Sequence, residues 1–162
     1  MADPKNISIR EARDDDADGL IKLIGDIFED YQDCVLDLEK LDKELLAIDT
    51  YIKGLHGKFW VAELEGRVVG CIGYGQKENK TIELKRLYVA DDMRRSGLGS
   101  RLFQLVFFAA AANAAKAIDL WSDTRFAEAH AFYLAKGFEQ QPETRNLNDP
   151  SNSVEYHFIK YL

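Results

Sequence analysis

The segment IELKRLYVADDMRRSGLGSRLF, residues Ile82–Phe103, runs from a strand-like pattern through a glycine-containing loop into a helix-like pattern. Gly97 and Gly99 stand one residue apart, although glycine within a helix costs about 1 kcal/mol relative to alanine. A strand, a glycine loop and a helix form a site for anions, because the first N–H groups of a helix have no partner within it. Arg94 and Arg95 add positive charge to the loop. We therefore expect a phosphate group, and more specifically a pyrophosphate, to lie against this backbone.

Two other phosphate-binding patterns do not fit the chain. The P-loop pattern G-x-x-x-x-G-K-[ST] is absent, and the dinucleotide pattern G-x-G-x-x-G does not match the spacing of the segment. A second glycine-rich run, GCIGYG at residues 70–75, follows a predicted hairpin and precedes no helix. We interpret it as part of a strand in which glycine permits close packing or a bulge.

Length and composition predict one compact domain over residues 1–162. Hydrophobic residues make up 46% of the chain and charged residues 30%, which supports a packed core and does not indicate disorder. The formal net charge of −7 argues against a general nucleic-acid-binding protein, which would be basic. The same charge is compatible with a cationic substrate.

The cysteines bear on whether the protein binds a metal, and the hydrophobic runs bear on its location in the cell. Cys34 and Cys71 lack the C-x-x-C spacing and have no histidine cluster beside them, so we expect free buried thiols and no metal site. The first ten residues, MADPKNISIR, have neither the basic nor the apolar region of a secretory signal. No apolar run approaches the length that spans a membrane. These features predict a soluble cytoplasmic protein without a membrane partner.

Hydrophobic periodicity predicts ten elements in the order β, α, α, β, β, β, α, β, α, β. The strands and helices alternate in a way that favours an α+β fold, with a mixed, mostly antiparallel central sheet flanked by helices. The strand pair on either side of the third helix should be parallel, because a right-handed crossover connects it. A short strand could follow the last helix, before a polar loop over residues 140–153. The expected strands are 7–12, 58–64, 67–76, 80–90, 117–123 and 154–162, and the expected helices are 14–31, 37–55, 97–116 and 125–137.

Two ordered motifs carry a resemblance to a known family. R-x-x-G-x-G occupies residues 94–99, and A-x-x-x-Y-x-x-x-G-F occupies residues 129–138. Together with the hairpin FWVAELEGRVVGCIGYG, they resemble the GNAT superfamily of acyl-CoA-dependent N-acetyltransferases over nearly the whole chain. The resemblance implies the acyl-CoA N-acyltransferase fold and acetyl-CoA as cosubstrate, without a metal. The residues that it places against the cofactor are Leu87, Tyr88, Val89, Arg94, Arg95, Ser96, Gly97, Leu98, Gly99, Ser100 and Phe126.

Phe126 departs from the family pattern. Many members carry an asparagine seven residues before the tyrosine of the second motif, and its amide reaches the cofactor. The chain has Phe126 at that position, so a side-chain amide contact is not available. We expect the ring to pack on the pantetheine arm or on the neighbouring strand.

Tyr133 is the expected general acid, because the resemblance implies that this tyrosine protonates the sulfur of coenzyme A. A phenol with an ordinary pKa near ~10 is protonated at pH 7 and can donate a proton. The alternative is a core tyrosine that packs with Phe132 and Phe138, which explains the same spacing equally well.

Glu83 is the expected general base for the attacking amine, directly or through a water, because some members carry a glutamate at this offset. It lies four residues before Leu87 and would share a strand face with it. The resemblance also implies that backbone N–H groups of residues 87–89 face the developing oxyanion. The alternative for Glu83 is an ion pair with Lys85, and a β-bulge would change which residues share a face.

The expected reaction is transfer of an acetyl group from acetyl-CoA to a primary amine of a small molecule. A protein acetyltransferase for lysine or N-terminal amines, and a non-catalytic acyl-CoA-binding sensor, are the alternatives. A homodimer also stays open. The resemblance places the acceptor cleft between the first two helices and the loop before the last strand. The first of these segments carries acidic residues that either attract an amine cation or form a solvated helix face, namely Glu29, Asp30, Asp33, Asp37 and Glu39.

Overall fold

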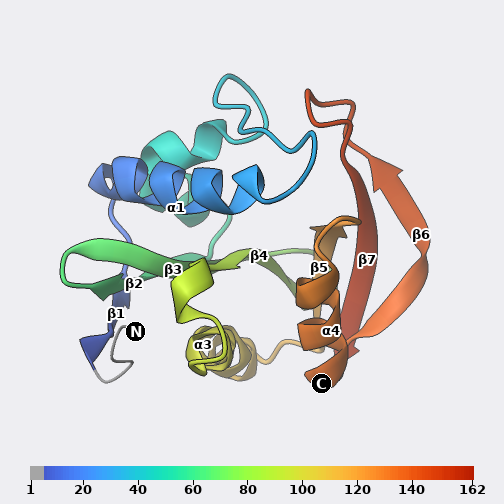
Figure 1. Ribbon diagram of the computed structural model, residues 1–162. Coiled ribbons are helices and arrows are strands. Elements are labelled where there is room, and N and C mark those ends of the chain that lie inside the picture. The colour runs from blue at the N-terminus through green and yellow to red at the C-terminus, as the bar shows by residue number, and fades with distance from the viewer. Residues whose placement is uncertain (1–5) are drawn as a thin grey trace.

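The computed structural model describes residues 6–162 and is organised around one seven-stranded sheet with helices on both faces (Figure 1). The strand order is β1-β2-β3-β4-β5-β7-β6. Strands β4 and β5 are parallel and the other neighbouring pairs are antiparallel, which confirms the predicted mixed, mostly antiparallel sheet. The strands are β1 (Ser8–Glu11), β2 (Lys58–Leu64), β3 (Arg67–Gln76), β4 (Thr81–Val89), β5 (Ala117–Asp123), β6 (Glu139–Asn146) and β7 (Val154–Tyr161).

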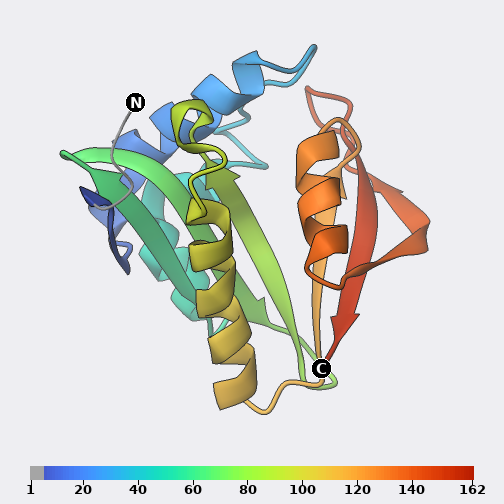
Figure 2. The same ribbon diagram turned by 60° about the horizontal axis from the view of Figure 1, so that its bottom comes forward.

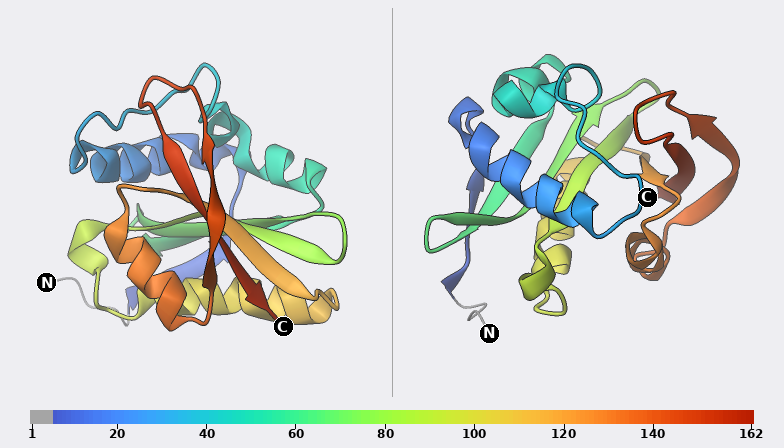
Figure 3. Two further views of the ribbon diagram at one scale, coloured as in Figure 1. Left: turned by 90° about the vertical axis from the view of Figure 1, so that its right-hand side faces the viewer. Right: turned by 45° about the horizontal axis from the view of Figure 1, so that its top comes forward.

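The helices form two layers, one on each side of the sheet (Figures 1 and 3). One layer lies over β2, β3 and β4, and the other covers the opposite face with α3 beside β4 and α4 beside β5 (Figure 2). Within residues 6–162, no helix is both long enough and apolar enough to cross a membrane. The first layer contains η2 (Asp14–Asp16), α1 (Ala17–Glu29), η3 (Lys43–Ala47) and α2 (Ile48–Gly54), and the second contains α3 (Leu98–Ala112) and α4 (Ala127–Ala135), with η4 (Asp91–Met93) before α3.

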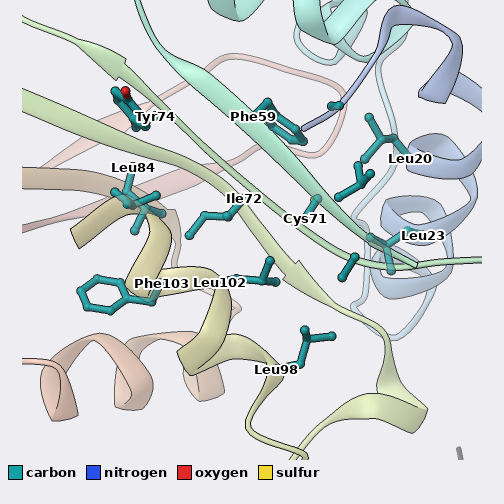
Figure 4. Close-up of a cluster of buried hydrophobic side chains, with 14 of the residues drawn as sticks. Leu20, Leu23, Phe59, Cys71, Ile72, Tyr74, Leu84, Leu98, Leu102 and Phe103 are labelled. Carbon is teal, nitrogen blue, oxygen red and sulfur yellow. The ribbon is translucent and has the colours of Figure 1, made fainter. Parts of the chain in front are cut away.

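The hydrophobic core lies on both sides of β3, which is why that strand has an almost uninterrupted apolar sequence. Leu20 and Leu23 of α1 reach it from one side, and Leu102 and Phe103 of α3 from the other (Figure 4). The buried positions 20, 23 and 27 of α1 and 98, 102, 106 and 110 of α3 recur at spacings of three and four, so each helix turns one apolar stripe toward the sheet. The glycine-rich run at residues 70–75 is part of β3, as its interpretation as a strand predicted.

The segment 37–55 is not the single helix that its periodicity predicted. Residues 37–42 form a closed turn, in which the Asp42 backbone N–H donates to the Asp37 carbonyl at 2.8 Å and the Asp42 carboxylate accepts the Asp37 N–H at 2.8 Å. Asp42 is buried, and this capping of the local backbone stops helical hydrogen bonding before residue 43. Only η3 and the short α2 follow.

The predicted polar loop at 140–153 and the predicted helix at 97–116 also differ from the structure. The first half of the loop is the edge strand β6, which is nearly all exposed and therefore lacks the alternation by which a strand is recognised. The ladder between β6 and β7 shifts register between Gln140 and Thr144, a segment that contains Pro142. Helix α3 ends at Ala112, and Asn113 caps it by donating from Nδ2 to the Ala109 carbonyl at 2.7 Å.

Two glycines near the start of β2 provide a test of the packing. A Cβ at Gly57 would lie 1.7 Å from the Tyr74 carbonyl oxygen, whereas a Cβ at Gly54 would meet nothing within 4 Å. Gly57→Ala should therefore lower the free energy of unfolding by about 1–3 kcal/mol, because the backbone of β3 must move. Gly54→Ala should leave it unchanged or raise it by up to about 1 kcal/mol, since alanine favours the helix. Urea denaturation of both variants measures the difference, and equal midpoints would contradict the close approach of residue 57 to β3.

Candidate active site

The site begins where β4 and β5 separate. The two strands pair only over Thr81–Glu83 and Ala117–Asp119, and they diverge beyond these residues (Figure 2). The divergence opens a cleft of about 960 Å³. Side chains from α1, η3, β4, the loop 91–97, β5, α4 and the β6–β7 hairpin line this cleft. It therefore brings together the glycine loop, the strand before it and the last helix, which the sequence motifs had selected separately.

A bulge in β4 sets the faces on which its side chains lie. Gly73 of β3 pairs with Lys85 and Cys71 pairs with Tyr88, so β4 has one residue more than β3 in this stretch. Arg86 takes up the extra length with φ of 57°, in the left-handed region. The expectation that Glu83 and Leu87 share a face is therefore wrong, because the bulge inverts the alternation between them.

Glu83 and Tyr88 lie on the face covered by α1 and α2. The ring of Tyr88 contacts Phe28 of α1, with ring centroids 6.0 Å apart. Burial, followed by the charges of Glu44 and Glu83, raises the pKa of Tyr51 on α2 to about 12. Glu83 and Tyr88 precede and follow the bulge, and both observations place their side chains in the half of the cleft under α1 and α2.

Arg86 holds the bulge against η3. Its Nη1 lies 2.7 Å from Asp42 Oδ1 and its Nη2 2.7 Å from Glu44 Oε1, with all three side chains largely buried. Burial opposes the charge on Arg86, but Tyr88, Glu44 and Asp42 outweigh it and hold the pKa of the guanidinium above its ordinary value. Arg86 therefore stays charged and ties the floor of the cleft to the wall formed by residues 41–44.

Glu83 lines the cleft with its side chain only 17% exposed. Lys85 Nζ lies 3.5 Å from Glu83 Oε1, which is the ion pair considered from the sequence. The pair does not remove Glu83 from the cleft, because Lys85 lines the same space. A carboxylate at the point where β4 and β5 separate can accept a proton from an amine bound in the cleft.

Tyr133 is part of the hydrophobic core and also lines the cleft. It is 5% exposed, and its ring packs with Phe138 at 5.7 Å and with Phe158 at 5.8 Å between centroids. Its side chain nevertheless lines the cleft. Burial raises the pKa of Tyr133, so the phenol stays protonated at neutral pH. The packing explanation and the proton-donor role are thus compatible in one side chain.

The glycine loop presents backbone rather than side chains at several expected positions. Gly97 has φ of 84° and precedes α3, and a Cβ there would meet no protein atom within 4 Å. Leu98 is buried in the core, and the Ser96 hydroxyl donates to the Met93 carbonyl at 2.5 Å. Neither of these two side chains lines the cleft, so they can contribute only main-chain groups. The residues of this motif that do line it are Arg94, Arg95, Gly97, Gly99 and Ser100.

Phe126 belongs to a cluster of aromatic side chains that line the cleft. Its ring centroid lies 4.8 Å from that of Tyr31 and 6.4 Å from that of Tyr88. Phe28 completes the group at 6.0 Å from Phe126. The predicted packing of Phe126 on the neighbouring strand agrees with its contact with Tyr88 on β4.

The acidic residues expected to attract an amine are not in the cleft. The side of α1 and the following loop that lines it is mainly apolar, with Ile27, Phe28 and Val35. The carboxylates of Asp42 and Glu44, the two acids of this region that do line it, are paired with Arg86. The residues that the attraction was assigned to, Glu29, Asp30, Asp33, Asp37 and Glu39, contribute nothing to the lining and are mostly exposed.

The β6–β7 hairpin reaches across to the loop after α1. The Val35 N–H donates to the Ser151 hydroxyl at 2.9 Å, and that hydroxyl donates back to the Val35 carbonyl at 3.1 Å. Arg125 also donates to the Ser151 carbonyl. These bonds join two segments far apart in the sequence at one end of the cleft.

Sequence reasoning missed several side chains of the cleft wall, among them Trp121 and Arg145. Trp121 stood in a short strand that was interpreted as buried, and Arg145 in a segment interpreted as loop. The alternation of β5 could have indicated Trp121, because it shares a face with Asp119 and Asp123. No local pattern around Arg145 indicated its place.

Comparisons with known proteins agree with the geometry. The family model of the acetyltransferase (GNAT) domain matches residues 55–140. N-acetylaspartate synthetase from Danio rerio is 32% identical over 121 residues, which are 74% of this chain and 42% of that protein. The chain thus spans less than half the length of the curated relatives that it matches.

Solved structures share the fold. An acetyltransferase from Streptococcus agalactiae superposes with a TM-score of 0.82 at 22% identity, covering 98% of this chain and 99% of that one. PaiA N-acetyltransferase from Thermoplasma acidophilum, solved in complex with coenzyme A, has a TM-score of 0.76 at 18% identity, covering 96% and 99%. The family model, which covers more than half of the chain, and this shared architecture lead to one conclusion: the chain belongs to the GNAT acetyltransferase family.

Proposed function

We propose that the chain transfers an acetyl group from acetyl-CoA to a primary amine of a small molecule, with Glu83 as general base and Tyr133 as general acid. The observation that carries the proposal is the single cleft lined by Glu83, Tyr133 and the glycine loop. Membership in the family supports the reaction class. The geometry of this chain supports the individual residues.

The residues present fit coenzyme A. The first intrahelical bond of α3 runs from the Arg101 N–H to the Gly97 carbonyl, so the preceding N–H groups of Gly99 and Ser100 can face a phosphate. The open space at Gly97 leaves this approach free of side-chain atoms. Within residues 6–162, the inner edge of β4 beyond Glu83 has no strand partner, and its main-chain groups can bind an extended amide chain.

Acetyl-CoA, when bound, supplies an acyl thioester to this cleft. Backbone N–H groups of residues 87–89 would donate to the acyl oxygen as negative charge develops there. Glu83 would take the proton of the attacking amine, directly or through a water, because an amine must be neutral to attack and free alkylamines have a pKa near ~10.4. Tyr133 would donate its proton to the departing sulfur, and its burial keeps that proton in place at neutral pH.

A compact acceptor fits the cleft better than a folded protein. The hydrogen bonds between Val35 and Ser151 join the two segments that border the acceptor side, which restricts the approach of a large surface. Relatives named N-acetylaspartate synthetase support an amino compound as acceptor. Since the chain spans less than half of those proteins, the likeness does not itself assign their acceptor to this chain.

Tyr133→Phe should lower kcat by ~10²–10⁴-fold with little change in KM, because the hydroxyl acts only as charge grows on sulfur. The measurement is thiol release from acetyl-CoA with a panel of amino acids, polyamines, aminoglycosides and lysine peptides. Tyr74→Phe is the matched control, since Tyr74 is a buried tyrosine outside the cleft and should leave kcat unchanged. An unaltered kcat for Tyr133→Phe would return Tyr133 to a packing role, and turnover confined to peptides would contradict the small acceptor.

Glu83→Gln should reduce kcat/KM at pH 7 and recover part of it near pH 10. The recovery follows because the fraction of neutral amine rises with pH, so the need for a base falls. Glu78→Gln, at an exposed glutamate in the turn before β4, is the control. A loss that is equal at every pH would show that Glu83 supports the site without accepting the proton.

Gly97→Val should weaken coenzyme A binding by at least about tenfold, because a branched side chain would occupy the open space and strain the backbone at φ of 84°. Gly99→Ala should change binding by less than about threefold, since its Cβ would make ordinary contacts of 3.6 Å or more. Isothermal titration with coenzyme A measures both. Equal affinities in the parent and in Gly97→Val would refute the role given to the loop.

A further inference from the structure

Apart from Glu83, the proposed base, the carboxylates on the acceptor side of the cleft have little free capacity to bind a ligand. Each one is engaged by a cation or by backbone and hydroxyl donors. The open hydrogen-bonding capacity of this side therefore lies in donors, which recognise anionic groups. The engaged pairs are Asp42 and Glu44 with Arg86, Asp123 with Arg125, Glu155 with Arg145, and Asp149 with Ser153.

Arg145 is the cation on this side with the most open geometry. Its Nε donates to Glu155 Oε1 at 2.7 Å, and its side chain remains 44% exposed. Among residues 6–162, the two terminal amino groups of this guanidinium have no partner. An arginine held through Nε keeps a planar pair of N–H donors for a carboxylate.

A rigid platform supports this guanidinium. Arg145 Cζ lies over the ring of Trp121 at 4.4 Å from its centroid. The Trp121 ring also stacks on His157, with centroids 4.3 Å apart and planes at 10°. His157 is fixed in turn, because Nε2 lies 3.0 Å from Asp119 Oδ2 and Nδ1 contacts Glu143. The guanidinium is thus preorganised, which lowers the entropy lost when it binds an anion.

The register of the sheet relates Trp121, which lies under Arg145, to the proposed base Glu83. Asp119 of β5 pairs directly with Glu83 of β4, and Trp121 lies two residues, about 7 Å, farther along β5. The guanidinium over Trp121 therefore lies on the same side of the sheet as Glu83 and borders the same cleft. Both Arg145 and Trp121 line the cleft.

We propose that Arg145 binds the carboxylate of the acceptor, so that the substrate class is amino acids and other amines that carry a carboxylate. The amine of such an acceptor faces Glu83 and its carboxylate meets the free edge of the guanidinium over Trp121. The inference rests on the proposed function and adds the specificity of its acceptor side.

The test compares pairs of acceptors that differ only by a carboxylate. Two pairs are L-phenylalanine with 2-phenylethylamine and L-leucine with isoamylamine. A third pair is L-aspartate with β-alanine, which lacks the α-carboxylate of L-aspartate but keeps the other one. The parent should prefer the α-amino acid of the first two pairs by at least about tenfold in kcat/KM. Arg145→Gln should lower kcat/KM for these amino acids by roughly 10- to 100-fold, mainly through KM, as expected for the loss of a charge-assisted pair. It should change kcat/KM for the carboxylate-free amines by less than about threefold.

Two further variants control the comparison. Arg145→Lys should retain part of the preference, because it keeps the charge and loses the planar pair of donors. Arg67→Gln removes an arginine from another exposed ion pair, with Asp92, and should change neither the preference nor the rates. Melting temperatures of all variants establish that they are folded.

The outcomes separate the inference from the proposed function. Acetylation of both members of each pair without preference, or an equal loss for both in Arg145→Gln, overturns the inference and leaves the acetyltransferase proposal standing. Absence of turnover with every amine, while coenzyme A still binds, overturns both.

Discussion

The site depends on the short parallel pairing of β4 with β5. Each strand remains paired on its other side, β4 with β3 up to Val89 and β5 with β7 up to Asp123, so the two must follow different neighbours once their own ladder ends. In the part of the chain that the structure describes, their inner edges then carry N–H and C=O groups without strand partners in a partly buried space. Unpaired backbone groups of this kind need water or a ligand, and an extended chain with amide groups satisfies them best.

The bulge at Arg86 is the second constraint, and it connects the sheet with the wall of the cleft. A buried guanidinium is tolerated only when carboxylates offset its desolvation, and here Asp42 and Glu44 provide them. Asp42 also closes the turn that interrupts the first helical layer. Asp42 therefore offsets the charge of Arg86 under β4 and also shapes the segment that borders the acceptor. In this way it links the bulge in β4 to the shape of the cleft.

The sequence predicted what depends on local patterns. The βαβ unit, the hairpin of β2 and β3 and the glycine loop follow from periodicity and from turn residues, and the structure contains all of them. The role of Asp42 under the bulge escaped prediction because its partner there, Arg86, lies 44 residues away in the sequence. Arg145 escaped because an edge strand exposed on both faces shows no alternation, and its contact with Trp121 exists only after three strands have paired.

The irregular edge strand β6 has a consequence for association between molecules. An exposed strand edge is a template on which another chain can add a strand and start aggregation. Pro142 lacks the N–H that such an addition needs, and the register shift between Gln140 and Thr144 bends the edge out of line. Charged side chains at Glu139 and Glu143 add repulsion between like edges. The same strand that carries Arg145 into the cleft thus protects the sheet from growing beyond seven strands.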